Sequence, residues 1–330
     1  MKMLIISGFL GAGKTTFIKE LIRRTDKRLV VLENEYGSAD VDQQLIKTED
    51  PADVWDLTEG CICCTKSADL NASVMTIEST LEPEYLVIEP SGVGALSNVI
   101  RNLRKIEYER ITLLRPLTIL DAEHFLQDCR AFPDICEDQI KAAGTVLISK
   151  PEFPDAKLFA QVEKAVRELN PEVEVLPQHY TRMPQGWWDA LLTTAYDGGS
   201  LKEVDESGLD LETCTITNCR AESPASLLWL LERAVRNCFG EILRAKGVLP
   251  AGKDWVSFDI VNGRISITGI GEELDFEKAE SVWIGRAIDR LPLRNLLSDP
   301  EPTFERDRPR SGQNLSARIT PDRRTKRRQS

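Results

Sequence analysis

The sequence predicts an α/β fold in which a mainly parallel sheet has helices on both faces, followed by a smaller α+β region. Short apolar runs alternate with helical patterns through the first half of the chain, which is typical of parallel strands buried on both faces. Farther along, Asn262-Gly263 separates two strand patterns, 255–261 and 264–268, and this dipeptide is a strong hairpin signal. The predicted buried strands are Met3–Ile6, Leu29–Leu32, Tyr85–Ile88, Leu117–Leu120 and Thr145–Ile148.

The first of these strands leads into Gly8-Phe9-Leu10-Gly11-Ala12-Gly13-Lys14-Thr15 and then into a helical pattern over Thr15–Arg24. The segment matches G-x-x-x-x-G-K-[ST] at every fixed position, between a strand and a helix as a phosphate-binding loop requires. Lys14 is expected to reach the β- and γ-phosphates of a nucleotide, and the Thr15 hydroxyl is expected to bind Mg²⁺. We therefore predict the sheet of a P-loop NTPase. A glycine-rich turn that binds nothing is the alternative.

Polar groups follow the other predicted strands. In open α/β sheets, ligands bind beyond the carboxyl ends of the strands, so we expect the site at this edge. The segments there are Glu33-Asn34-Glu35, Glu89-Pro90-Ser91-Gly92, Asp121 and Ser149-Lys150-Pro151-Glu152.

Three cysteines, Cys61, Cys63 and Cys64, fall within four positions. Thiolates suit Zn²⁺ and other soft or borderline ions, but three such closely spaced ligands leave a tetrahedral shell open. The open position favours transfer of the ion, with water, Glu35 or a recipient's ligand as the fourth partner. Buried small side chains or a redox pair are the alternative for this triplet. We interpret the remaining cysteines as reduced, small buried residues: Cys129, Cys136, Cys214, Cys219 and Cys238.

Composition sets the outer limits. The chain has 330 residues, and no apolar stretch is long enough to span a bilayer. It enters a strand at once instead of a signal peptide, so we expect a cytoplasmic protein. Residues 303–330 contain nine Arg or Lys against three Asp or Glu, a net charge of +6, which leaves −17 for residues 1–302. The acidic body argues against nucleic acid as a partner.

Changes in composition divide the chain. We predict a P-loop domain over 1–200, a linker over 201–212, a small α+β domain over 213–298 and a basic, disordered tail over 299–330. Residues 303–330 have too little apolar surface to offset the entropy of ordering them, so we expect them to be dispensable for catalysis.

Several motifs in order resemble the CobW-like P-loop GTPases, a family of metallochaperones and metal-linked cofactor-insertion proteins. The resemblance covers roughly residues 1–298. Its motifs are the phosphate loop followed by Thr16, a first switch at Glu33-Asn34-Glu35-Tyr36-Gly37 with Asp42, the metal motif Gly60-Cys61-Ile62-Cys63-Cys64, a second switch at Glu89-Pro90-Ser91-Gly92, and a domain end at Val282–Arg286 with Asp289-Arg290.

The resemblance implies GTP hydrolysis coupled to metal or cofactor delivery. It implies a client metalloprotein or cofactor-dependent enzyme as the partner and leaves a homodimer open. The metal at Cys61, Cys63 and Cys64 would be Zn²⁺, with Co²⁺ or Ni²⁺ as alternatives, and Mg²⁺ would lie at Thr15 and Glu89. The implied catalytic residues are Lys14, Glu35, Asp42, Glu89 and Gly92, and the implied GTP-binding residues are Gly8, Gly11, Ala12, Gly13, Lys14, Thr15, Thr16, Ser149, Lys150 and Glu152.

Two segments depart from the family pattern. Ser149-Lys150-Pro151-Glu152 replaces the usual Asn-Lys-x-Asp, so Glu152 offers the guanine-binding carboxylate on a longer side chain after a stiffer backbone. Guanine selection is then weaker, and relaxed nucleotide use is the alternative. Pro90-Ser91 stands where two threonines are usual, but Glu89 and Gly92 are kept.

Two other classes of function stay open at this point. A P-loop phosphotransferase acting on a small molecule would need neither the cysteine triplet nor Ser149–Glu152. A metal-binding regulatory protein with a decayed nucleotide site would bind metal without turnover. Hydrolysis of GTP and ATP, measured with and without metal, separates all three classes.

Overall fold

The structure is a computed structural model that describes residues 1–33, 53–56, 67–149, 156–176, 179–199, 201–206, 211–270 and 279–297, with backbone only for 53–56 and 67–69. Met1–Asp299 form one compact unit. The predicted tail lies outside the described residues. The predicted domain boundaries stay predictions.

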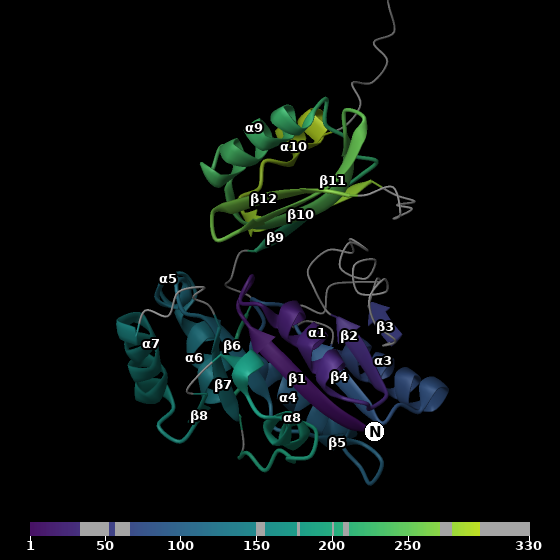
Figure 1. The fold of residues 1–330 in the computed structure, drawn as a ribbon, viewed down its shortest axis with the longest axis vertical. Coiled ribbons are helices and arrows are strands. Elements are labelled where there is room, and N and C mark those ends of the chain that lie inside the picture. The colour runs from purple at the N-terminus through teal and green to yellow at the C-terminus, as the bar shows by residue number, and fades with distance from the viewer. Residues whose placement is uncertain are drawn as a thin grey trace, which may run out of the picture. The chain divides into compact units, whose positions relative to one another are not determined.

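The first sheet confirms the predicted fold class (Figure 1). Its order among the described strands is β3-β2-β4-β1-β6-β7-β8, with β5 also paired to β1, and every pairing is parallel. Parallel pairing requires a crossover between strands, and the helices supply it. The strands are β1 (Lys2–Gly8), β2 (Leu29–Glu33), β3 (Asp53–Asp56), β4 (Tyr85–Glu89), β5 (Thr112–Leu113), β6 (Leu117–Asp121), β7 (Thr145–Ser149) and β8 (Glu174–Val175).

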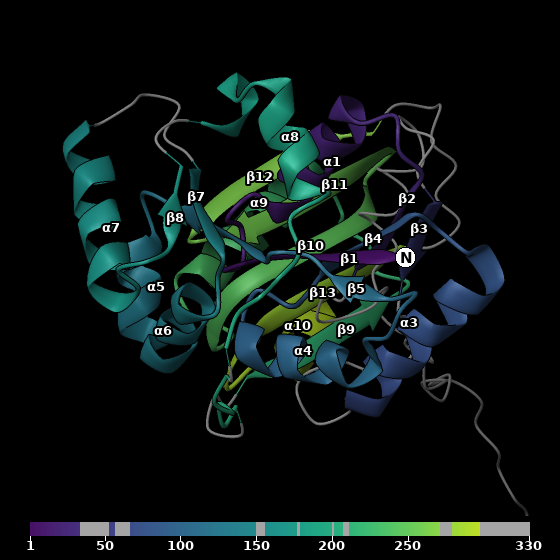
Figure 2. The same cartoon turned by 90° about the horizontal axis from the view of Figure 1, so that it is seen from below.

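Alternate side chains of β1 pack on opposite faces of this sheet, as strand geometry dictates. Met3 and Ile5 join a core with α3, α4, α6 and α7, whereas Leu4 and Ile6 join a core with α1 and α8 (Figure 2). Both faces are therefore covered, which explains the continuous apolar runs. The helices are α1 (Lys14–Arg24), α3 (Ser67–Leu81), α4 (Leu96–Leu103), α5 (Phe125–Ala131), α6 (Pro133–Lys141), α7 (Ala156–Leu169) and α8 (Gln185–Leu191), with short 3₁₀ turns η1 (Arg104–Ile106) and η2 (Tyr180–Arg182).

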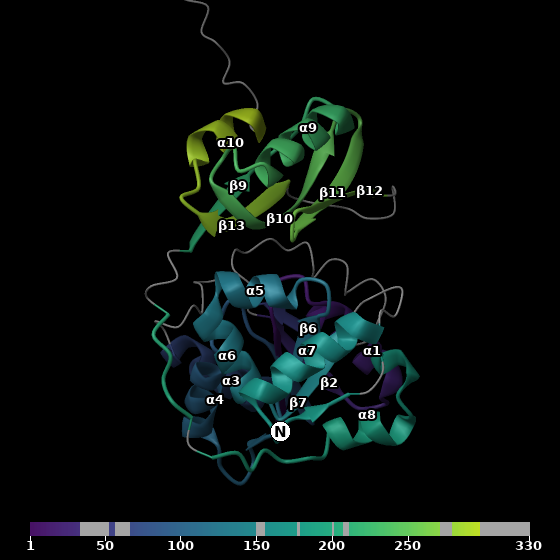
Figure 3. The same ribbon diagram turned by 90° about the vertical axis from the view of Figure 1, so that its left-hand side faces the viewer.

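The second sheet is antiparallel, with order β12-β11-β10-β13-β9, and α9 and α10 pack on one of its faces (Figure 3). The predicted hairpin is confirmed, because β11 pairs with β12 and both Asn262 and Gly263 have positive φ, 51° and 72°. The elements are β9 (Glu212–Thr217), α9 (Pro224–Val235), β10 (Glu241–Ala251), β11 (Asp254–Val261), β12 (Arg264–Gly269), β13 (Glu280–Arg286) and α10 (Arg290–Leu297).

β10 was not predicted from the sequence. α9 ends at Val235, and Asn237 follows with φ 60°, a left-handed conformation that commonly ends helices. The sequence does not indicate the strand β10 because Gly247 and Pro250, which are typical turn residues, interrupt its apolar pattern.

The cysteine interpretation needs two corrections. Cys129 and Cys136 form a disulfide between α5 and α6, with Cα atoms 5.1 Å apart, so the expectation of reduced thiols is wrong for this pair. Consecutive helices joined by a short turn bring the two side chains together. Cys238 is exposed because it lies beyond the end of α9, whereas Cys214 and Cys219 are buried as expected.

Residues 201–206 form hydrogen bonds with the segment that follows β4. The Glu206 carboxylate accepts a hydrogen bond from the Ala95 backbone N–H, and Asn98 exchanges two hydrogen bonds with Val204. Burial raises the pKa of Glu206 to about 7, although the Ala95 N–H partly opposes the shift. The carboxyl group is therefore mostly protonated in the folded chain only below about pH 7.

This shift predicts a pH-dependent stability. The pKa of Glu206 is 4.5 in the unfolded chain and about 7 in the folded one, so the folded state binds more protons between these values and the free energy of unfolding falls as pH rises through that window. Glu206→Gln keeps an oxygen that can accept from the Ala95 N–H but removes the partly buried negative charge present at pH 8. The substitution should raise the free energy of unfolding at pH 8 by about 1 kcal/mol, a value reduced because the side chain is partly exposed.

Thermal melts of both proteins from pH 5 to pH 8 check this expectation, with Glu203→Gln on the same segment as the control. Parallel melting profiles for Glu206→Gln and the wild type would contradict it.

Candidate functional site

The phosphate loop joins the end of β1 to the start of α1. Gly13 precedes the helix with φ 97°, a left-handed conformation that a residue with a Cβ adopts only with strain. The loop therefore delivers the chain into α1 at Lys14 with the first N–H groups of the helix pointing outward. Such N–H groups and the helix dipole together favour an anion at this position.

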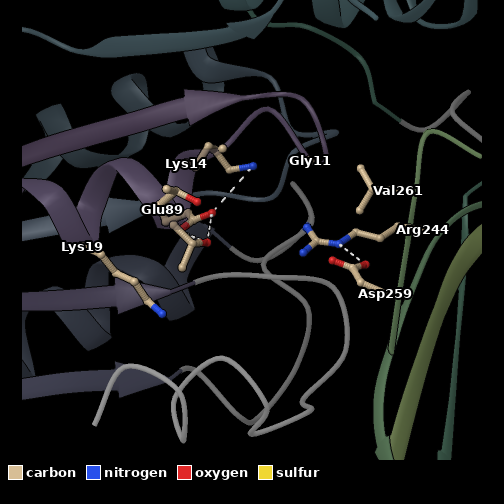
Figure 4. A pocket seen from close by; sticks show the side chains of 10 residues that line it. Gly11, Lys14, Lys19, Glu89, Arg244, Asp259 and Val261 are labelled. Carbon is tan, nitrogen blue, oxygen red and sulfur yellow. Dashed lines mark hydrogen bonds and ion pairs between the residues drawn. The ribbon is translucent and has the colours of Figure 1, made fainter. Parts of the chain in front are cut away.

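Lys14, Thr15 and Glu89 lie together at the carboxyl ends of β1 and β4 (Figure 4). The Lys14 Nζ donates hydrogen bonds to the backbone oxygens of Gly8 and Phe9 at 3.1 and 3.2 Å and lies 3.7 Å from Glu89 Oε1. The Thr15 hydroxyl donates to Glu89 Oε2 at 3.2 Å. A hydroxyl and a carboxylate are hard oxygen ligands that suit Mg²⁺, so the two side chains predicted to share this ion lie close enough to do so.

A pocket of about 330 Å³ opens over the loop. Its lining joins the loop and the start of α1 to the second sheet, whose contribution was not predicted from the sequence (Figure 4). The lining residues are Gly11, Gly13, Lys14, Thr15, Thr16, Lys19, Glu89, Arg244, Asp259 and Val261.

Gln139 of α6 holds the loop that follows β4. Its amide nitrogen donates to the backbone oxygens of Gly92 and Gly94 at 3.3 and 3.0 Å, and the side chain is almost fully buried. Gly92 itself lies against the phosphate loop, since a Cβ there would come within 2.5 Å of the Leu10 nitrogen. Gln139 was missed because a glutamine within a helix carries no sequence signal for such a contact.

Ser149 ends β7 and contacts the phosphate loop. Its hydroxyl oxygen lies 2.6 Å from the backbone oxygen of Ala12 and 3.2 Å from that of Leu120, and the residue is buried. Ser149 therefore connects the end of β7 to the phosphate loop. Its predicted contact with a nucleotide base stays a prediction.

The other predicted site residues lie outside the described residues, and their roles stay predictions. They are Glu35, Asp42, Cys61, Cys63, Cys64, Lys150 and Glu152. Within the part of the chain that the structure describes, Asp121, Glu123 and His124 bring ligand atoms within 4.8 Å of one another. His124 Nδ1 lies 3.0 Å from Asp121 Oδ2, and Glu123 pairs with Arg264, so protein contacts account for these side chains. No helix among the described residues is long and apolar enough to cross a membrane.

The fold and the phosphate loop define a P-loop nucleotide-binding protein. The model of the family described as CobW/HypB/UreG, nucleotide-binding domain, matches residues 2–177, and the chain belongs to this family.

Among curated relatives, the chain is 32% identical over 196 residues to the zinc chaperone CobW of Sinorhizobium sp, covering 50% of this chain and 53% of the relative. It is 32% identical over 151 residues to the zinc chaperone YeiR of Escherichia coli (strain K12), covering 45% of this chain and 46% of the relative. The matches thus span about half the length of these relatives. The crystal structure of Zn(II)-bound YjiA GTPase from E. coli aligns with a TM-score of 0.42 and 16% identity, over 90% of this chain and 97% of that one.

Proposed function

We propose that this chain is a GTP-hydrolysing protein that holds a divalent transition metal and delivers it, in the cytoplasm, to a client metalloprotein or cofactor-dependent enzyme. The meeting of Lys14, Thr15 and Glu89 beside one pocket carries the nucleotide half of the proposal. Family membership and relatives named as zinc chaperones support the metal half.

The described residues divide the nucleotide chemistry among them. Lys14 would neutralise negative charge on the β- and γ-phosphates. Thr15 and Glu89 would hold Mg²⁺, which when bound would neutralise further charge on the phosphates. The Gly92 N–H would donate to the γ-phosphate, in a loop that Gln139 already orients. We assign Glu35 and Asp42, which follow β2 in the chain, to the first switch on the family resemblance alone.

The metal would be bound by Cys61, Cys63 and Cys64. Zn²⁺ is the default cargo because thiolates favour it, with Co²⁺ and Ni²⁺ as alternatives that geometry and availability in the cell decide. These cysteines fall in sequence between Glu35 and Glu89, so both switches flank the metal motif. If GTP tightens metal binding, the metal must tighten GTP binding by the same factor.

The test is hydrolysis of GTP and ATP by the purified chain, with and without Zn²⁺. Preferential turnover of GTP that responds to the metal supports the proposal. Phosphate transfer to a small molecule, or metal binding without turnover, would instead identify one of the alternative classes.

Glu152→Ala should weaken binding of GTP by about tenfold and binding of ATP by much less, since only guanine offers N1–H and N2–H to this carboxylate. Titration of both nucleotides into the variant and the wild type measures the difference. Equal losses for GTP and ATP would show that Glu152 does not select the base.

A further inference from the structure

Arg244 lies on β10, on the face of the second sheet opposite α9 and α10. Side chains alternate along β10, and Ala245 and Leu249 belong to the core under these helices, whereas Val248 packs with Leu10 of the phosphate loop. Because Arg244 and Val248 are four positions apart on one strand, their side chains share this second face. In the antiparallel register, Arg244 lies opposite Val261 of β11.

The second sheet contacts the phosphate loop directly at this point. A Cβ built on Gly11 would meet the Val261 Cγ1 at 1.9 Å, so the valine side chain packs against the glycine backbone. Leu10 and Val93 form one apolar cluster with Val248, Val282 and Ile284. Through these contacts, β10 and β11 pack directly against the phosphate loop.

The Arg244 side chain extends from β10 into the pocket, toward Lys14 and Glu89 (Figure 4). It is mostly buried, with 13% of its side-chain area exposed, and its Nε lies 3.9 Å from Asp259 Oδ1. A guanidinium group has five N–H donors, so an ion pair through Nε is compatible with a bidentate contact from the terminal nitrogens to a phosphate.

We propose that Arg244 binds the terminal phosphate of the nucleoside triphosphate held by Lys14 and Thr15, so that the second sheet completes the nucleotide site. Arg244 lies outside residues 2–177, the segment that the family model matches. The Arg244 guanidinium group, on the side of the pocket opposite the loop, would neutralise the negative charge that spreads over the γ-phosphate oxygens while the γ-phosphoryl group is transferred to water. The inference rests on the proposed nucleotide binding.

The experiment titrates the full chain with GDP and with a non-hydrolysable GTP analogue, both with Mg²⁺, and measures GTP turnover. Arg244→Ala should weaken binding of the analogue by about tenfold or more and change GDP affinity by less than about threefold, because only the triphosphate carries the group that Arg244 contacts. Turnover should fall at least about tenfold. Arg244→Lys keeps the positive charge but loses the planar guanidinium group. Its analogue affinity and its turnover should therefore lie between those of the wild type and of Arg244→Ala.

Asp259→Asn separates this role from a structural one. If Arg244 binds phosphate, removing the neighbouring negative charge should tighten binding of the analogue by about twofold or more. If the Arg244–Asp259 pair only holds the sheet, Asp259→Asn should reproduce the loss seen in Arg244→Ala, and that result would overturn the inference.

Arg264→Ala is the matched control. Arg264 lies on β12 of the same sheet and pairs with Glu123 of the nucleotide-binding part, but it does not line the pocket. Its replacement should leave the difference between analogue and GDP affinity unchanged. An Arg244→Ala protein that binds the analogue like the wild type, while Lys14→Ala does not, would defeat this inference alone. A wild type that binds no nucleotide would defeat the proposed function itself.

Discussion

Replacing Lys14 with alanine should weaken GTP binding by roughly 100-fold, since the variant loses charge-assisted contacts to two phosphates. We expect the fold to survive, because the described contacts of the Lys14 side chain are polar ones, with the backbone oxygens of Gly8 and Phe9 and with the Glu89 carboxylate. Calorimetric titration with GTP and Mg²⁺ measures the affinity, and a thermal melt reports the fold.

Lys164→Ala on α7 is the control for this experiment. That lysine is 79% exposed, so its loss removes the same charge from the molecule outside the pocket. Wild-type affinity in Lys14→Ala, or an equal loss in both variants, would contradict the assignment of the phosphate loop.

The double replacement Cys63→Ser, Cys64→Ser should lower affinity for Zn²⁺ by roughly 100-fold or more, since loss of a supporting residue alone costs 10- to 100-fold at metal sites. Nucleotide binding should persist, because the phosphate loop is a separate element. Competition against a chromophoric chelator measures the metal affinity. Cys238→Ser is the matched control, since Cys238 is an exposed free thiol.

Exchange of GDP for a non-hydrolysable GTP analogue should change the Zn²⁺ affinity of the wild type by roughly 5- to 150-fold, the usual range of coupling between sites. The same titration in the cysteine variant provides the reference without the metal motif. Identical Zn²⁺ affinity in both nucleotide states would rule out nucleotide control of metal delivery.

Local patterns were enough to predict the first sheet and the phosphate loop. The strand residues Met3–Ile6 and Tyr85–Ile88 are apolar because both faces are covered, and Gly13 with Lys14 specifies the loop backbone. The hairpin at Asn262-Gly263 was predictable for a similar reason, since both residues tolerate positive φ.

Features that depend on distant parts of the chain were not predictable. Arg244 and Gln139 reach the site through tertiary packing, and neither has a neighbouring residue that would identify it. The Cys129–Cys136 bond depends on how α5 and α6 are oriented, which seven residues of spacing do not specify. Ser149 was predicted beside the base, but its hydroxyl also contacts the phosphate loop because β7 ends next to Ala12.

The cluster of Leu10, Val93, Val248, Val282 and Ile284 limits how the chain can be divided into fragments. A fragment beginning near Leu211 would retain α9, α10 and the core beneath them, but it would lack Leu10 and Val93. Three aliphatic side chains of β10 and β13 would then face water together, and exposed apolar patches promote self-association. We therefore expect such a fragment to self-associate more readily than the full chain.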